Sequence, residues 1–171
     1  MKKLSLTLFV AVGLMFSSVA QSLKINAEDA KIEFNFVDKS TTGTVEGLKA
    51  EVNFDISDLS NASISGSVDI TTLTTSNKQR DKHLQASDMF DAANHPTMDF
   101  KSTSIEAQED QFIMKGELTI KGTTKEVEIP FTYKDKTFEG KLVVFTNDFD
   151  VFSQKKREQS KVLVKITIPV Q

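Results

Sequence analysis

Apolar and polar residues alternate through most of this 171-residue chain, and this period of two limits the folds that it can adopt. The run KIEFNF, for example, places Ile32, Phe34 and Phe36 on one side of an extended strand. Similar runs follow, separated by short polar turns such as EDQ, KGTTK and KDK. Strict alternation predicts antiparallel strands with one buried and one solvated face.

About eight such strands are expected, which is enough to close an all-β barrel and to remove the sheet edges that promote aggregation. A β-sandwich is the alternative arrangement. Two residues interrupt the pattern. Gly116 falls in phase with its buried neighbours, as at a kink or bulge, and Pro130 falls in the opposite phase, where an edge or a bulge would tolerate it.

The apolar face is rich in phenylalanine, with 13 phenylalanines, one tyrosine and no tryptophan in the whole chain. Phenylalanine has a large apolar surface and no polar atom that must find a partner, so it suits a dry interior. The interior of an eight-stranded barrel can be filled by side chains or can hold one small ligand. Alternation alone does not decide between these two possibilities.

The N-terminal 20 residues have the organisation of a secretory signal peptide. A basic start precedes the apolar run Leu4–Phe16, which is too short to span a bilayer, and small residues stand at Ser18 and Ala20. Cleavage after Ala20 would leave one domain, residues 21–171, in the periplasm or secreted, without a transmembrane anchor. There is no cysteine, so the domain must fold without disulfides.

Composition also argues against several functions. The chain has 24 acidic and 21 basic residues, a net charge of −3, whereas nucleic-acid binding needs a clustered positive surface. No cysteine nucleophile and no G-x-S-x-G motif is present in the sequence. We therefore expect no nucleic-acid partner, no enzymatic activity and no cofactor.

The segment RDKHLQASDMFDAANHPTMDF, residues 80–100, breaks the alternation. It predicts a helix over 77–84, capped by Thr75 or Ser76, and a second over 88–95, capped by Ser87 and ended by Pro96. In that arrangement one face would be apolar. The residues of this face are Ala86, Met89, Phe90 and Ala93. We expect residues 77–95, here called the lid, to cover one end of the barrel.

The lid also contains side chains that could bind a metal ion. Both histidines of the chain, His83 and His95, lie in it with Asp81, Asp88 and Asp91. No H-E-x-x-H or comparable spacing is present, however, so structural roles are favoured and no metal site is predicted.

A basic run, QKKREQSK at residues 154–161, precedes the last expected strand. A solvated hairpin tip is the simpler interpretation. Attraction to anionic lipid headgroups or to a phosphate is the alternative.

These motifs resemble those of the YceI-like lipid/polyisoprenoid-binding family, which has an R-D-x-H-L element, a D-x-F-D element and a P-T-x-x-F-K-S-T strand. The matching residues are Arg80, Asp81, His83 and Leu84, then Asp88, Phe90 and Asp91, then Pro96, Thr97, Phe100, Lys101, Ser102 and Thr103. Downstream, GELTIKGTTKEVEIPF at 116–131 resembles the family's G-x-L-T-I-x-G-x-T-K strand pair. The resemblance extends from about residue 30 to the end of the chain.

The resemblance implies a lipocalin-like antiparallel barrel with a long apolar cavity for an isoprenoid or another long-chain lipid. One departure is TNDFDVF, where family members often have N-R-x-D-F-G. The arginine is missing, and Asp150 stands where glycine is common.

We therefore predict an exported carrier, store or sequestering protein for such a lipid. The alternative is a stress-related structural or partner-binding barrel with a filled core. The oligomeric state is left open, with a dimer as one possibility. Arg80 and His83 are the candidates for contacting the ligand headgroup. The predicted chain-binding residues are Phe34, Phe36, Phe54, Val68, Ile70, Leu84, Phe90, Met98, Phe100, Met114, Leu118 and Phe131.

Overall fold

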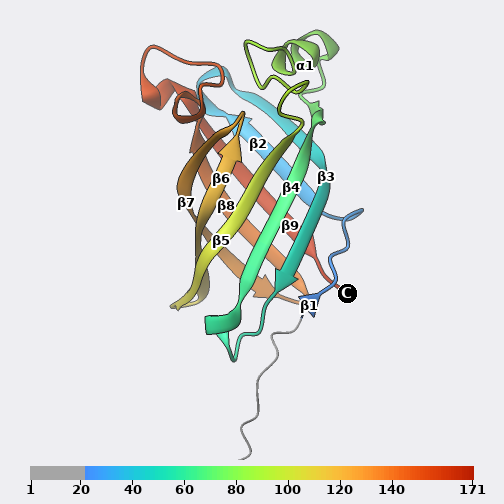
Figure 1. Cartoon of the computed structure of the whole chain (residues 1–171), viewed down its shortest axis with the longest axis vertical. Helices are drawn as coiled ribbons and strands as arrows, with labels where there is room; N and C mark the ends of the chain where they lie inside the picture. Colours follow the sequence, from blue (N-terminus) through green and yellow to red (C-terminus); the bar gives the residue numbers. More distant parts are fainter. Residues whose placement is uncertain (1–21) are drawn as a thin grey trace, which may run out of the picture.

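Eight antiparallel strands close into a barrel in the computed structural model, which describes residues 22–171 (Figure 1). The strands are β2 (Lys31–Phe36), β3 (Thr41–Asn53), β4 (Ser63–Thr74), β5 (Thr97–Gln108), β6 (Gln111–Ile120), β7 (Thr123–Lys134), β8 (Thr137–Phe145) and β9 (Lys161–Pro169). Each strand pairs with the next along the chain, and β9 pairs with β2 to complete the ring. The predicted all-β, lipocalin-like barrel is confirmed, and the sandwich alternative is wrong.

Short elements lie at the two ends of the barrel. The upper end in Figure 1 has α1 (Lys78–Leu84) and the loop with η3 (Thr146–Phe149) and η4 (Arg157–Ser160), and η1 (Val37–Lys39) is a neighbour of η4. The lower end has the two-residue strand β1 (Ser22–Leu23), which pairs with the end of β3, and η2 (Leu59–Asn61). The predicted signal peptide, residues 1–20, lies outside the described residues.

Strand β8 shows most clearly how the alternation in the sequence produces one buried and one exposed face of the barrel wall. Phe138, Leu142 and Val144 are buried, whereas Lys141 and Val143 between them are exposed. Successive side chains of a strand point to opposite faces, so the buried set faces the lumen and the exposed set faces water.

Two phenylalanines of the wall lie against glycines on the neighbouring strand. Phe34 on β2 is directly opposite Gly43 on β3, where a Cβ atom would lie 2.4 Å from the ring. A Cβ atom at Gly116 on β6 would lie 2.5 Å from the Phe100 ring of β5. The absence of a side chain at each glycine lets the ring lie close to the wall.

The two predicted irregularities both correspond to changes in strand pairing. The β5–β6 register shifts between Ser102 and Ser104, and Ser102 is the partner of Gly116. Strand β7 pairs with β8 only from Phe131 onward, so Pro130 precedes this ladder and its missing N–H removes no hydrogen bond to β8.

Replacing Gly116 by alanine should destabilise the barrel, because the added methyl group would lie 2.5 Å from the backbone carbonyl oxygen of Lys101 as well as against Phe100. We expect the free energy of unfolding to fall by about 1–3 kcal/mol, measured by urea denaturation. Gly140→Ala is the matched control, since its nearest neighbour is an Ile129 methyl group at 3.3 Å. Equal losses in both variants would contradict this account.

Candidate ligand-binding cavity

A cavity of about 470 Å³ lies inside the barrel. This volume is within the range of about 300–1,000 Å³ that is typical of small-molecule sites. Every strand of the barrel contributes an apolar side chain to its wall. Examples in strand order are Phe34, Val45, Ile64, Met98, Met114, Ile129, Leu142 and Val164. The interior is therefore neither filled nor polar along most of its length.

Most of the residues predicted from the sequence line this cavity. They are Phe34, Phe36, Val68, Leu84, Phe90, Met98, Phe100, Met114 and Leu118, together with the headgroup candidates Arg80 and His83. Phe54, Ile70 and Phe131 do not line it.

Phe54 and Phe131 instead belong to an aromatic cluster. The Phe54 ring lies edge-on to those of Phe112, Phe131, Tyr133 and Phe138, with centroids 5.3–5.8 Å apart. Such edge-to-face pairs are favourable because the positive edge of one ring meets the negative face of the next.

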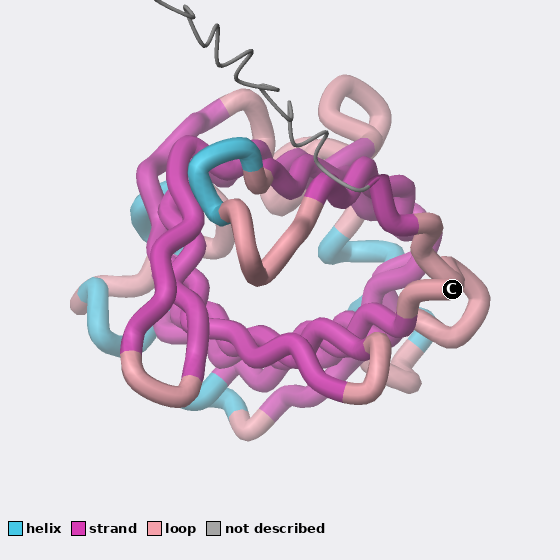
Figure 2. Tube along the Cα trace, turned by 90° about the horizontal axis from the view of Figure 1, so that it is seen from below, coloured by secondary structure: helices cyan, strands magenta, loops and turns pink. Residues whose placement is uncertain are grey.

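The aromatic cluster fills the lower end of the barrel. Its residues come from the lower ends of β6, β7 and β8 and from the chain just after β3. Seen from below, the connection between β3 and β4 reaches over the opening of the barrel (Figure 2). The cavity is thus closed at this end and opens at the upper end, where its charged lining residues Lys39, Arg80, His83 and Asp99 lie.

The alternation along β4 places Ile70 on the inner face of the barrel, but its side chain does not line the cavity. Its side chain is buried, and its backbone N–H donates a hydrogen bond to the Pro96 carbonyl oxygen, 2.9 Å away. It belongs to the support of the lid.

Several lining residues were missed by the sequence reasoning. Val162, Val164, Ile166 and Ile168 come from β9, whose alternation was visible in KVLVKITIPV. Phe149, Val151 and Phe152 come from the loop after β8 and have no periodic signal that could have revealed them.

The lid begins with α1, which Asn77 caps by accepting hydrogen bonds from the backbone N–H groups of Gln79 and Arg80. The prediction that Thr75 or Ser76 caps this helix is therefore wrong, and the cap is Asn77. Asparagine is among the residues preferred at this position because its side-chain oxygen satisfies free N–H groups of the first turn.

The predicted second helix over 88–95 is wrong, because residues 87–90 and 92–94 form two separate turns and no helix. Asp91 has a left-handed backbone conformation, φ 52°, and its carboxylate accepts hydrogen bonds from the Asn94 side chain. Such local bonds compete with helix formation. The apolar face changes as a result: Met89 and Ala92 are buried, while Ala93 is exposed.

Asp81 attaches α1 to the end of β4. Its carboxylate accepts hydrogen bonds from the Thr74 hydroxyl at 2.9 Å, the Thr75 N–H at 2.8 Å and the Thr75 hydroxyl. Burial raises the pKa of Asp81, but these bonds and the charge of Arg80 outweigh burial, so its pKa lies below its ordinary value. The carboxylate is therefore charged at neutral pH, as this anchoring requires.

The two headgroup candidates, Arg80 and His83, differ in how far their side chains are already held by contacts within the protein. Arg80 donates from Nε to the Thr75 hydroxyl at 2.7 Å and from Nη2 to the Thr75 carbonyl oxygen at 3.0 Å. His83 is largely exposed, and its Nε2 lies 3.3 Å from an Asp88 carboxylate oxygen. Arg80 thus stabilises the lid, whereas His83 is open to solvent at the edge of the cavity.

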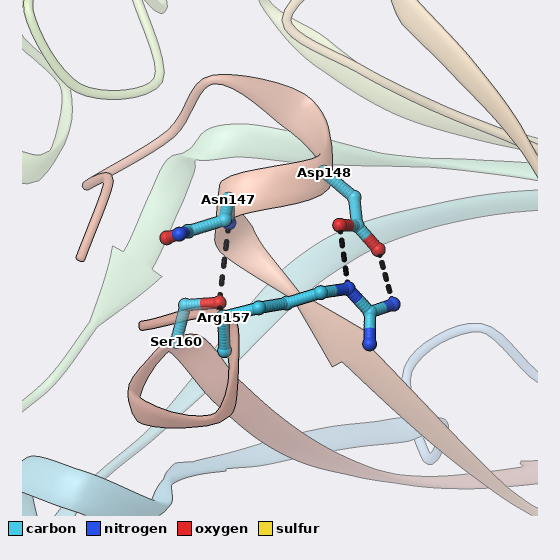
Figure 3. Close-up of polar contacts among 4 residues, drawn as sticks. All are labelled: Asn147, Asp148, Arg157 and Ser160. Atoms are coloured by element: carbon cyan, nitrogen blue, oxygen red, sulfur yellow. Dashed lines mark hydrogen bonds and ion pairs between the residues drawn. The ribbon is translucent and has the colours of Figure 1, made fainter. Parts of the chain in front are cut away.

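Residues 146–160 lie at the upper end across from α1 (Figure 1), and several of them line the cavity. Figure 3 shows the polar contacts within this loop. Arg157 forms a two-bond ion pair with Asp148, with distances of 2.8 and 2.6 Å, and its guanidinium lies over the Phe145 ring. The Asn147 N–H donates to the Ser160 hydroxyl at 3.3 Å. The Arg157 contact lowers the pKa of Asp148, so both groups stay charged and hold the loop closed on itself.

Asp150, the departure noted in the sequence, has φ 53°. This left-handed conformation explains why glycine is suited to the position, and aspartate is one of the few other residues that adopt it readily.

Within residues 22–171, no group of three or more histidine, aspartate or glutamate side chains is arranged to hold a metal ion. The same residues contain no helix of sufficient length and apolarity to cross a bilayer.

An up-and-down barrel with an apolar cavity beneath a lid defines a class of proteins, the β-barrels whose interior has room for one small ligand. The YceI-like domain matches residues 23–171, and the chain therefore belongs to the YceI-like family. Protein YceI of Escherichia coli O157:H7 is 29% identical over 169 residues, covering 88% of each chain.

Two solved structures share this fold. BcnA of Burkholderia cenocepacia superimposes with a TM-score of 0.77 at 23% identity, covering 85% of this chain and 98% of BcnA. A polyisoprenoid-binding domain from Saccharophagus degradans gives a TM-score of 0.58 at 10% identity, covering 88% of this chain and 97% of that domain. These superpositions show a common fold.

Asp81→Asn should loosen the lid, because the neutral amide accepts weaker hydrogen bonds from Thr74 and Thr75. We expect amide hydrogen exchange in α1 to become about fivefold faster, which corresponds to a loss of about 1 kcal/mol. The difference from wild type should be full at neutral pH and should vanish as the pH falls through the lowered pKa of Asp81, where its carboxylate is protonated. Asp110→Asn, at an exposed position in the turn between β5 and β6, is the matched control and should leave this exchange unchanged.

Proposed function

We propose that the protein binds an isoprenoid or another long-chain lipid in its cavity, as an exported soluble carrier, store or sequestering protein. The observation that carries this proposal is a blind cavity of about 470 Å³ whose walls are apolar on all eight strands. A polar substrate would leave its own hydrogen-bonding groups without partners there, which is costly. An unbranched or prenyl chain has no such groups.

The affinity would come mainly from apolar burial. A five-carbon prenyl unit contributes up to about 4 kcal/mol at roughly 0.8 kcal/mol per buried carbon. Ordering of the chain and loss of its free motion offset part of this gain. Chain length and shape, more than polar contacts, would therefore determine which lipids bind.

At the cavity opening, a hydroxyl or phosphate headgroup could contact His83 and the remaining donor nitrogen of Arg80. Both residues line the cavity next to the lid. Binding, and not catalysis, is the role that this arrangement supports. The filled-core alternative predicts no cavity and is not favoured by the volume described above.

The first test is native mass spectrometry of the exported protein, purified without detergent, followed by solvent extraction. We expect an additional mass that extracts as a lipid, and N-terminal sequencing of the same sample would locate the signal cleavage, expected after Ala20. A bare polypeptide that also fails to bind fluorescent prenyl and acyl probes would refute the proposal.

Leu142→Trp should block the cavity, because Leu142 lines it and the larger ring would project into the lumen. We expect a prenyl probe to bind at least about tenfold more weakly, or about 1.4 kcal/mol, in a fluorescence titration. Val143→Trp is the matched control, since the adjacent side chain is 47% exposed on the outer face. Similar losses in both variants would place the probe outside the lumen.

A further inference from the structure

The edge of the cavity opening contains apolar side chains that the fold leaves in solvent. Val37 of η1 is 43% exposed, and Phe152 of the loop after η3 is 36% exposed. The Phe152 ring packs edge-on against Phe36, the residue before Val37, with centroids 5.5 Å apart. The two exposed side chains therefore belong to one region of the surface.

This apolar region continues into the cavity. Phe36 and Phe152 both line the cavity, whereas Val37 does not. A lipid chain that leaves the lumen here would pass from the apolar cavity wall to the exposed apolar side chains of Phe152 and Val37. Phe152 belongs to both surfaces.

Lysine side chains surround the same region. Lys39 follows Val37 in η1, and Lys155 and Lys156 lie between Phe152 and η4. Lys39 is paired with Asp38 at 2.8 Å, but in the described part of the chain no ion pair involves Lys155 or Lys156. We call Val37, Lys39, Phe152, Lys155 and Lys156 the rim.

The charge beside the rim differs from that of the whole chain, in which acidic residues outnumber basic ones. In η1 and residues 146–161, five basic residues stand against four acidic ones: Lys39, Lys155, Lys156, Arg157 and Lys161 against Asp38, Asp148, Asp150 and Glu158. Ion pairs join Lys39 to Asp38 and Arg157 to Asp148, and within the described residues Lys155, Lys156 and Lys161 have no such pair. An anionic surface would therefore attract this side of the cavity opening.

We propose that the rim docks on an anionic lipid bilayer, with Val37 and Phe152 entering the headgroup region and Lys155 and Lys156 contacting anionic headgroups. This inference rests on the proposed function, because a lipid in the cavity must enter from a membrane or return to one. Passage through water would expose each methylene group at a cost of about 0.8 kcal/mol. Contact between the rim and the bilayer avoids that exposure.

The test is flotation with vesicles of phosphatidylcholine and phosphatidylglycerol, compared with phosphatidylcholine alone. Wild-type protein should float with the anionic vesicles at low salt and less at high salt. Lys155→Gln/Lys156→Gln should weaken this binding by roughly 25-fold, about fivefold for each lysine. Val37→Ser should weaken it by about fivefold.

Matched variants at the lower end provide the controls. Lys134→Gln/Lys136→Gln removes two exposed lysines there, and Ile56→Ser removes a side chain that is 58% exposed. Both should float like wild type. Equal losses at the two ends, or equal flotation with both vesicle types, would overturn the proposal. So would concentration-dependent self-association that Val37→Ser abolishes, since the rim would then bind a second copy.

Docking and cavity binding are tested separately. Neither Val37 nor the two lysines line the cavity, so their variants should bind a short soluble prenyl probe as wild type does. Loss of flotation with probe binding retained supports the rim as the docking surface. Flotation by a wild-type protein that binds no probe would refute the lipid-binding function and, with it, the reason for docking.

Discussion

The closed ring of backbone hydrogen bonds is the constraint on which the other features of this molecule depend. Because β9 pairs with β2 and β3 pairs with β4, every strand directs alternate side chains into one lumen. The lumen of an eight-stranded ring can either be filled by side chains or leave room for a ligand. The size of the side chains at each level of the barrel decides which of the two occurs there. In the lower part, the rings around Phe54 fill the space. Higher up, Phe34 and Phe100 lie against glycines and leave it open.

Polar side chains at the upper end mainly hold the protein's own segments in place. Asp81 holds α1 against β4, and the Arg157–Asp148 pair holds the loop after β8. The pKa of each of these two carboxyl groups lies below its ordinary value, so both stay ionised over the neutral range. Few polar groups are left to select a ligand, which agrees with recognition by length and shape.

The sequence predicted the barrel because a period of two is a direct consequence of strand geometry. It predicted much of the cavity wall for the same reason. The alternation shows only that a side chain points inward, however, and not whether it lines the cavity or packs in the filled part of the barrel. Phe34 and Phe131 have the same phase signal, and their different surroundings depend on height along the barrel and on cross-strand neighbours. The second helix of the lid was predicted wrongly because the turn at Asp91 depends on side-chain hydrogen bonds. The contribution of Phe152 depends on the tertiary path of a loop.

The aromatic cluster at the lower end gives the cavity a direction. A molecule with one apolar and one polar end can enter only tail first, and its polar end then remains at the opening beside His83. Chains that are polar at both ends would have to bury one of those ends against the rings of Phe54 and Phe131, and would be rejected. A bound lipid would also keep its reactive end accessible while its tail is sheltered, so another protein could modify or accept that end before the tail leaves the barrel.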